Sequence, residues 1–202
     1  MMFAADLFKP FEFEFFRNGV IVATLAGALC GVVGCYVVLR NMSYIGHGLS
    51  HAIFGGYAVA GLIGINLFLG AGAWGVITAL AIGGIVRRRP IGSDAAIGVV
   101  TTASFALGLA LVQLYGSPGQ NADALLFGNV LGVTFADVWL IVAVSIGAAL
   151  FIGFGYRQLL FTTFDIEVAK ATGVRTGLVD GLLMVLLSAT VLATMNVMGV
   201  TL

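Results

Sequence analysis

The sequence predicts an all-α, polytopic bundle of transmembrane helices that forms a single domain of residues 1–202, with about six spans. Hydrophobic residues make up 60% of the chain and charged residues only 9%, against roughly 25% charged in an ordinary soluble domain. Apolar runs of about 20 residues recur between basic or turn residues, as in membrane-spanning helices. Basic and acidic residues are equal in number, nine of each, so net charge gives no indication of a nucleic-acid partner.

The elements follow in order from these runs. Residues 1–18 mix phenylalanines with charged side chains and predict an interfacial lead-in that lies against the lipid. Basic residues or turn residues then stop the first five spans. The last span has no such stop, so we expect the chain to be truncated at its C-terminus, with further spans after residue 202. The six predicted spans are 19–39, 44–65, 67–86, 95–115, 138–155 and 181–202.

The connection between the fourth and fifth spans contains a short apolar run, residues 125–133. The run is too short to cross a bilayer as a helix. Either a re-entrant or interfacial helix or an ordinary loop helix fits the pattern, and both interpretations stay open.

The distribution of basic residues predicts the orientation in the membrane. If Arg40 lies on the cytoplasmic side, alternation of the spans places seven basic residues inside and two outside, which agrees with the positive-inside rule. The N-terminus and the segment 116–134 are then extracytoplasmic. The inside set is Arg40, Arg87, Arg88, Arg89, Arg157, Lys170 and Arg175, and the outside set is Lys9 and Arg17.

The second span carries both histidines of the chain, His47 and His51. A spacing of four residues places their imidazoles on one face of a helix. Ionisable side chains at membrane depth usually face a bundle interior, a pathway or a partner. They could form hydrogen bonds between helices, or they could bind a metal ion. Two imidazoles fall short of the four ligands that zinc prefers, but a two-fold homodimer would add a second pair.

The cytoplasmic segment 157–177 contains helix start and stop signals. Thr162 and Asp165 have the spacing of a capping box, and Gly173 is a natural residue to follow a helix C-terminus. They predict a helix of about three turns. Such a helix could dock into a groove of a soluble partner, or it could be a solvated connector.

Three stretches resemble the permease subunits of bacterial zinc, manganese and iron ABC importers. Residues 39–56, LRNMSYIGHGLSHAIFGG, are similar to the family signature LRRMSLIGDALSHA, with His47 in place of the usual aspartate. The second is LFGNVLGVT, residues 126–134, which is similar to LFGDLLAVT of the family. The third is MNVMGVTL, residues 195–202, which is similar to a segment after which the family's permeases continue into further spans.

The resemblance implies a multi-pass protein of the bacterial cytoplasmic membrane that passes a divalent metal ion. It implies four kinds of partner: a cytoplasmic ATPase, an extracytoplasmic metal-binding protein, a second permease copy and membrane lipid. It places the metal ligands at His47 and His51. The residues implied in coupling to the ATPase are Asp165, Glu167, Ala169 and Gly173.

The sequence lacks the phosphate-binding motif G-x-x-x-x-G-K-[ST], and Lys9 and Lys170 are its only lysines. We therefore expect a transport subunit rather than an enzyme, with ATP hydrolysis on a partner chain and no permanently bound cofactor. Because His47 replaces an oxygen ligand by nitrogen, zinc is favoured over manganese as the transported ion. The alternatives are a permease for iron chelates and an intramembrane metalloenzyme, the second opposed by the lack of an H-E-x-x-H motif.

Overall fold

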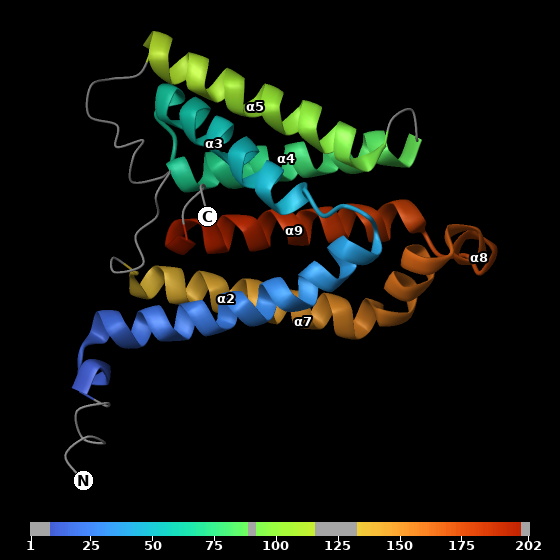
Figure 1. The fold of residues 1–202 in the computed structure, drawn as a ribbon, viewed down its shortest axis with the longest axis horizontal. Helices are drawn as coiled ribbons and strands as arrows, with labels where there is room; N and C mark the ends of the chain where they lie inside the picture. Colours follow the sequence, from blue (N-terminus) through green and yellow to red (C-terminus); the bar gives the residue numbers. More distant parts are fainter. Residues whose placement is uncertain (1–8, 89–91, 116–132, 199–202) are drawn as a thin grey trace.

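The computed structural model describes residues 9–88, 92–115 and 133–198, and within these ranges every regular element is a helix (Figure 1). The all-α prediction is therefore confirmed. The predicted short apolar segment lies outside the described residues except for Val133. The elements are η1 (Lys9–Glu12), α2 (Glu14–Leu39), α3 (Ile45–Ile63), α4 (Leu67–Arg88), α5 (Ser93–Tyr115), α7 (Phe135–Phe164), α8 (Ile166–Ala171) and α9 (Thr176–Met198).

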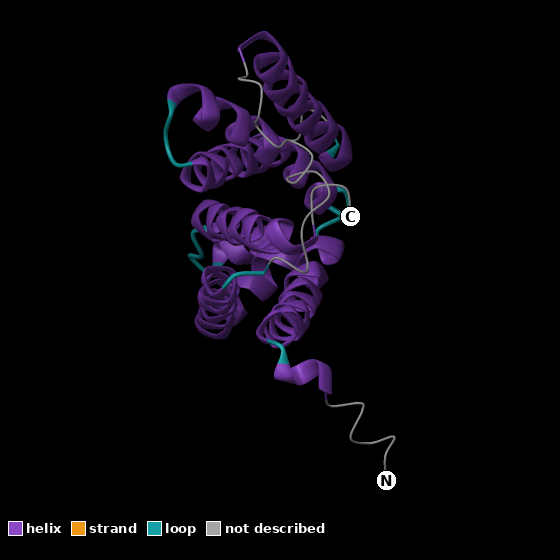
Figure 2. Cartoon of the chain, turned by 90° about the vertical axis from the view of Figure 1, so that its left-hand side faces the viewer, coloured by secondary structure: helices purple, strands orange, loops and turns teal. Residues whose placement is uncertain are grey.

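The long helices form two groups that meet along α4 and α9. In the first group α3 packs against both α5 and α4, and in the second α7 packs against α9 and α2. Contacts between α4 and α9 join the groups, and the end-on view shows the two groups one above the other (Figure 2). The short helix α8 lies at one end of the bundle, and the described N-terminal residues lie at the opposite end (Figure 1).

Five of the described helices, α2, α4, α5, α7 and α9, are long and apolar enough to cross a membrane. The predicted second span forms the helix α3 but is not among these five. Two imidazoles and Ser50 interrupt an otherwise apolar helix. Most of α3 is buried, with Ile45, Leu49 and Ile53 fully enclosed, whereas His47 is exposed.

Three helices extend beyond the predicted spans, because helical segments continue past charged residues. Helix α2 starts at Glu14, inside the predicted lead-in. Helix α7 runs through Arg157 to Phe164, because residues 156–164 contain no glycine or proline to stop it. Helix α9 begins at Thr176, five residues before the predicted start at Gly181. The segment 157–177, which the sequence assigns to the cytoplasmic side, is therefore largely helical.

Side-chain caps fix the starts of α4 and α7. Asn66 accepts hydrogen bonds from the backbone N–H groups of Phe68 and Leu69 and so caps α4. Thr134 and Asp137 form a reciprocal capping box at the start of α7. Each cap satisfies backbone donors that have no partner within the helix.

Glycine allows α3 to approach its neighbours closely. A methyl group added at Gly55 would lie 2.6 Å from the Ser104 backbone oxygen on α5, and one at Gly75 on α4 would lie 2.8 Å from Ile53. Ser104 also accepts a hydrogen bond from Trp74 Nε1 at 2.7 Å and donates one to the Ala52 carbonyl oxygen at 3.1 Å. Helices α3, α4 and α5 therefore form one tightly packed unit around α3.

Candidate functional site

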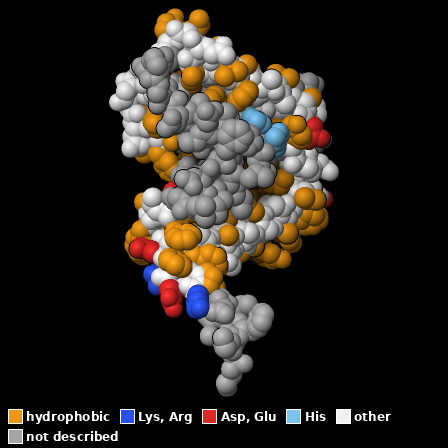
Figure 3. Space-filling model, turned by 60° about the vertical axis from the view of Figure 1, so that its left-hand side comes forward, with side chains coloured by type: hydrophobic (Ala, Val, Ile, Leu, Met, Phe, Trp, Pro, Cys, Tyr) orange, Lys and Arg blue, Asp and Glu red, His pale blue; other side chains and the backbone are white. Residues whose placement is uncertain are grey.

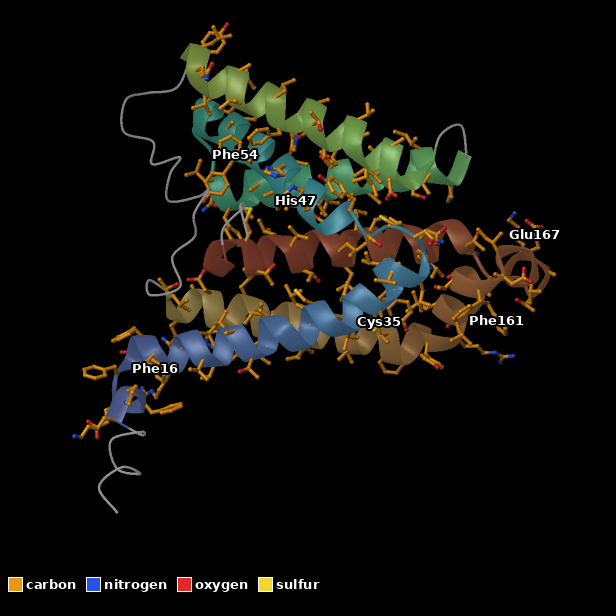
Figure 4. All side chains as sticks on the ribbon, in the orientation of Figure 1. Phe16, Cys35, His47, Phe54, Phe161 and Glu167 are labelled. Carbon is orange, nitrogen blue, oxygen red and sulfur yellow. The ribbon has the colours of Figure 1, made fainter. Side chains whose placement is uncertain are left out.

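The two histidines lie side by side near the start of α3. His47 is in the first turn and His51 is one turn later, and Figure 4 labels His47 on this helix. Their Nε2 atoms are 3.2 Å apart. The ring centroids are 4.5 Å apart, and the ring planes are inclined by 85°. The structure thus brings together the two predicted site residues, with the same atom of each ring directed at the other.

The 3.2 Å separation allows both uses of the pair that the sequence leaves open. Two imidazole nitrogens at this distance, each about 2.1 Å from one ion, subtend an angle of about 100° at the metal. That angle lies between octahedral and tetrahedral values, so the pair could chelate one cation with little movement. The same distance also suits a hydrogen bond between one protonated and one unprotonated nitrogen.

The pair faces an open pocket of about 260 Å³ on the surface of the chain. Helix α5 supplies one wall through Thr101, Thr102 and Phe105, and Tyr44 lies at the beginning of α3. Figure 3 shows the histidine side chains at the molecular surface. The site is therefore accessible from outside a single copy of the chain.

Aromatic rings fix the imidazoles from both sides. The Tyr44 ring lies 5.4 Å from His47, and the Phe105 ring lies 5.0 Å from His51, both in edge-to-face geometry. The Nδ1 atom of His51 is buried and has no hydrogen-bond partner among the described residues. Nε2 is thus the nitrogen of His51 that remains available to a ligand. Tyr44, Thr101 and Phe105 carry no sequence signal for this role, because only the packing of α5 on α3 brings Thr101 and Phe105 to the pair.

A single copy supplies too few ligands for a complete metal site. The described parts of the chain contain no cluster of three or more histidine, cysteine, aspartate or glutamate side chains that could hold a metal ion. The pair therefore offers two nitrogen ligands on an open face. Further ligands must come from solvent, from another chain or from residues outside the described ranges.

The predicted coupling residues gather on and around α8, at the end of the bundle where Figure 4 labels Glu167. Asp165 accepts hydrogen bonds from the backbone N–H groups of Glu167 and Val168, each at 3.0 Å. Ala169 is the buried residue of the helix. Glu167 is paired with Lys170 at 2.9 Å, and both side chains are exposed. Gly173 follows the helix with φ of +79°, a conformation that favours glycine.

Two details of the predicted coupling helix are wrong. The helix has six residues rather than about three turns. Thr162 takes no part in its cap, because it lies within α7 and donates to the carbonyl oxygens of Gln158 and Leu159. Asp165 is itself the N-cap. Because α7 continues to Phe164, it includes residues that the sequence had assigned to the first turn of the coupling helix.

Sequence reasoning missed an ion pair between Arg40 and Asp180 at the same end of the bundle. Their side chains are 2.6 Å apart and are 11% and 13% exposed. Arg40 had been interpreted as the stop of the first span and as a marker of the cytoplasmic side. The presence of one acidic residue, Asp180, beside the last apolar run was the available signal, although its partner 140 residues away could not be read from the sequence.

Comparisons with known proteins agree with the resemblance noted in the sequence. The profile of the ABC 3 transport family matches residues 12–202. The "Manganese transport system membrane protein MntC" of Halalkalibacterium halodurans is 39% identical over 191 residues, which cover 95% of this chain and 65% of that protein. The "Probable iron transport system membrane protein" of Haemophilus influenzae is 34% identical over 97% of this chain and 72% of that protein.

One solved structure, PsaBC from Streptococcus pneumoniae in complex with Fab, is similar in both fold and sequence. It superposes with a TM-score of 0.80 and 34% identity, covering 98% of this chain and 72% of that chain. This chain therefore spans between 65% and 72% of the length of these three relatives.

Proposed function

Because this chain belongs to the ABC 3 transport family, we propose that it is the membrane-spanning subunit of an ABC importer that passes a divalent transition metal ion. Members related to it are named as transport membrane proteins rather than enzymes, and five long apolar helices agree with a multi-pass protein of the bacterial cytoplasmic membrane. One observation of the structure carries the metal assignment: the Nε2 atoms of His47 and His51 stand 3.2 Å apart in an open pocket.

A second copy of the chain would complete the site. The pair lies on an exposed face and supplies two ligands, and a two-fold axis near that face would place an identical pair opposite. Four nitrogens would then surround one ion between the subunits. Neutral imidazoles would hold the ion without formal negative charge, which favours release as well as entry along a transport path.

Manganese is the first cargo that we propose, because the relative at 39% identity is named for manganese transport. The preference for zinc predicted from the sequence has no support from the names of these relatives, and it depends on the two nitrogen ligands alone. We therefore propose that zinc competes with manganese at this site. The H. influenzae relative makes iron a further cargo to include in the test.

The proposal requires two partner proteins. ATP hydrolysis would take place on a cytoplasmic ATPase subunit that receives α8, since α8 is short, capped and exposed at one end of the bundle. An extracytoplasmic metal-binding protein would deliver the ion to the opposite end. No cofactor has to be bound permanently, because the metal is the cargo.

Competition uptake of manganese, zinc and iron into cells that express the complete transporter tests this function. We expect His51→Ala to abolish uptake of all three ions while assembly with the ATPase is retained, because removal of one imidazole destroys the chelating pair. Tyr57→Phe, on the same helix but outside the pocket, is the matched control and should transport like wild type. Undiminished uptake by His51→Ala would show that the two histidines have only a structural role.

His47→Asp extends the same experiment to metal preference. A carboxylate at this position supplies the oxygen ligand that manganese prefers, so the ratio of manganese to zinc uptake should rise by roughly tenfold, the effect of about 1.4 kcal/mol. Gly46→Asp adds the same charge at an open position of α3 outside the pocket lining and should not produce that shift. An unchanged ratio in His47→Asp would show that position 47 does not set preference.

A further inference from the structure

Arg40 ends α2 and connects this helix to two others. Its Nη1 atom donates to Asp180 Oδ1 at 2.6 Å, Nη2 donates to Thr162 Oγ1 at 2.9 Å, and Nε donates to Thr163 Oγ1 at 3.2 Å. Thr162 and Thr163 belong to the last turn of α7, and Asp180 belongs to the second turn of α9. One largely buried guanidinium thus holds three helix ends together.

Both ends of α8 lead to this cluster. Thr163 lies two residues before Asp165, which caps α8, and α9 begins only a few residues after α8 ends. The short helix packs against both α7 and α9. A displacement of α8 relative to the bundle therefore acts on the anchors that Arg40 contacts.

In the other direction Arg40 begins the corner that leads into α3. Asn41 in this corner has a left-handed φ of 54°. The next residues are fixed in the core, with Met42 4% exposed and Ile45 fully buried. His47 follows in the first turn of α3. A movement of Arg40 is thus passed to the helix that carries the histidine pair.

A cavity of about 300 Å³ separates the corner from α8. Arg40 and Met42 line one part of it, and Phe164, Ile166 and Asp180 line another. The space allows the N-terminal end of α8 to shift relative to the turn between α2 and α3 without an immediate clash. The hydrogen bonds of Arg40 link the two sides of the cavity, and they would transmit such a shift.

We propose that Arg40 is a positioning residue that, through Asp180, Thr162 and Thr163, passes the displacement of α8 to the helix of His47 and His51. This inference rests on the proposed function, because it assumes that an ATPase moves α8. The planar fork of arginine is needed to reach an aspartate and two hydroxyl groups at once, which the single ammonium of lysine cannot do. The ion pair alone is therefore not sufficient for the role.

The experiment separates transmission from stability. Arg40→Met alone leaves the Asp180 carboxylate without its partner, which destabilises a buried site. The double variant Arg40→Met with Asp180→Leu removes both charges and should recover stability, because an apolar pair often replaces a buried ion pair without loss. Arg157→Met is the matched control, since Arg157 is exposed on α7 and its guanidinium lies over the Phe161 ring, 5.7 Å from the ring centroid.

The readout is the labelling rate of a single cysteine, Thr102→Cys, in the pocket of the histidines, measured in the complete complex with and without ATP. We expect ATP to change this rate in wild type and in Arg157→Met. In the stable double variant the ATP-dependent change should fall by roughly tenfold or more, while assembly and thermal unfolding stay near wild type. Arg40→Lys should restore stability but only part of the response.

Two results would overturn the inference in distinguishable ways. A double variant that keeps the full ATP-dependent change in labelling would mean that Arg40 and Asp180 only stabilise the fold, whereas the proposed function would stand. If wild type itself bound no ATPase and its labelling did not respond to ATP, the proposed function would fail, and the inference would fail with it.

Discussion

Two glycines of α3 differ in the space available for a larger side chain. Gly46 faces open space, with no described atom within 4 Å of an added methyl group, whereas Gly55 lies against the backbone and hydroxyl of Ser104. The sequence presents both as small residues in an apolar helix. Only Gly55 is required for the packing of α3 on α5.

We expect Gly55→Ala to destabilise the protein by about 1–3 kcal/mol, because the added methyl group would overpack the contact with α5. Gly46→Ala should be neutral or stabilising by about 0.5–1 kcal/mol, since alanine has the higher helix propensity. Thermal unfolding in detergent measures both. Equal behaviour of the two variants would contradict the close approach of the helices.

The histidine pair was predicted from its spacing, whereas its environment was not. A separation of four residues requires that His47 and His51 share a face of the helix, whereas the 3.2 Å between their Nε2 atoms also depends on how the two rings are oriented. Of the two aromatic rings beside the pair, Tyr44 lies at the start of α3, whereas Phe105 comes from α5. Phe105 is 54 positions away from His51, and the sequence contains no periodicity that joins them.

At the scale of elements, two short-range signals flank the six residues of α8. Asp165 starts it by accepting two backbone hydrogen bonds, and Gly173 allows the chain to turn back toward α9. Gly173 was read correctly from the sequence as a stop, whereas Asp165 had been placed three residues after a start at Thr162 and is itself the N-cap. The length of α8 was not predicted, because α7 continues as a helix for as long as nothing interrupts it.

Gly173→Leu should disturb the end of α8, because a side chain with φ near +79° costs about 1 kcal/mol or more. We expect ATPase assembly or transport to decline while membrane insertion is retained. Gly153→Leu on α7 is the control, since Gly153 has a helical conformation and open space around it. Wild-type pull-down and uptake in Gly173→Leu would exclude a role for the α8 turn in coupling.

At the scale of the whole molecule, the order of helices reproduces the predicted alternation. Arg40 and Arg87 line one cavity, at the end of the bundle that also carries α8. The described N-terminal residues lie at the other end. The sequence predicted this arrangement because hydropathy and basic stops are local properties. It did not predict that α4 packs on α9, which depends on side-chain shapes from distant segments.

Single cysteines test the predicted sidedness. Ile65→Cys in the exposed connection after α3 should react with an impermeant thiol reagent from outside the cell, and Lys170→Cys on α8 only from the cytoplasm. Cys30 and Cys35 are exposed in the structure, so both are first replaced by alanine, and this cysteine-free chain is the control. Labelling of both positions from the same side would refute the topology.

The burial of α3 has a consequence for biogenesis. Most of this helix packs against α4 and α5, which follow it in the chain. A nascent α3 therefore lacks its packing partners until those two helices emerge from the ribosome. We therefore expect the segment that carries the histidines to reach its final position in the membrane only after α4 and α5 have been inserted. The histidine pocket would then form only when the three-helix unit of α3, α4 and α5 is complete.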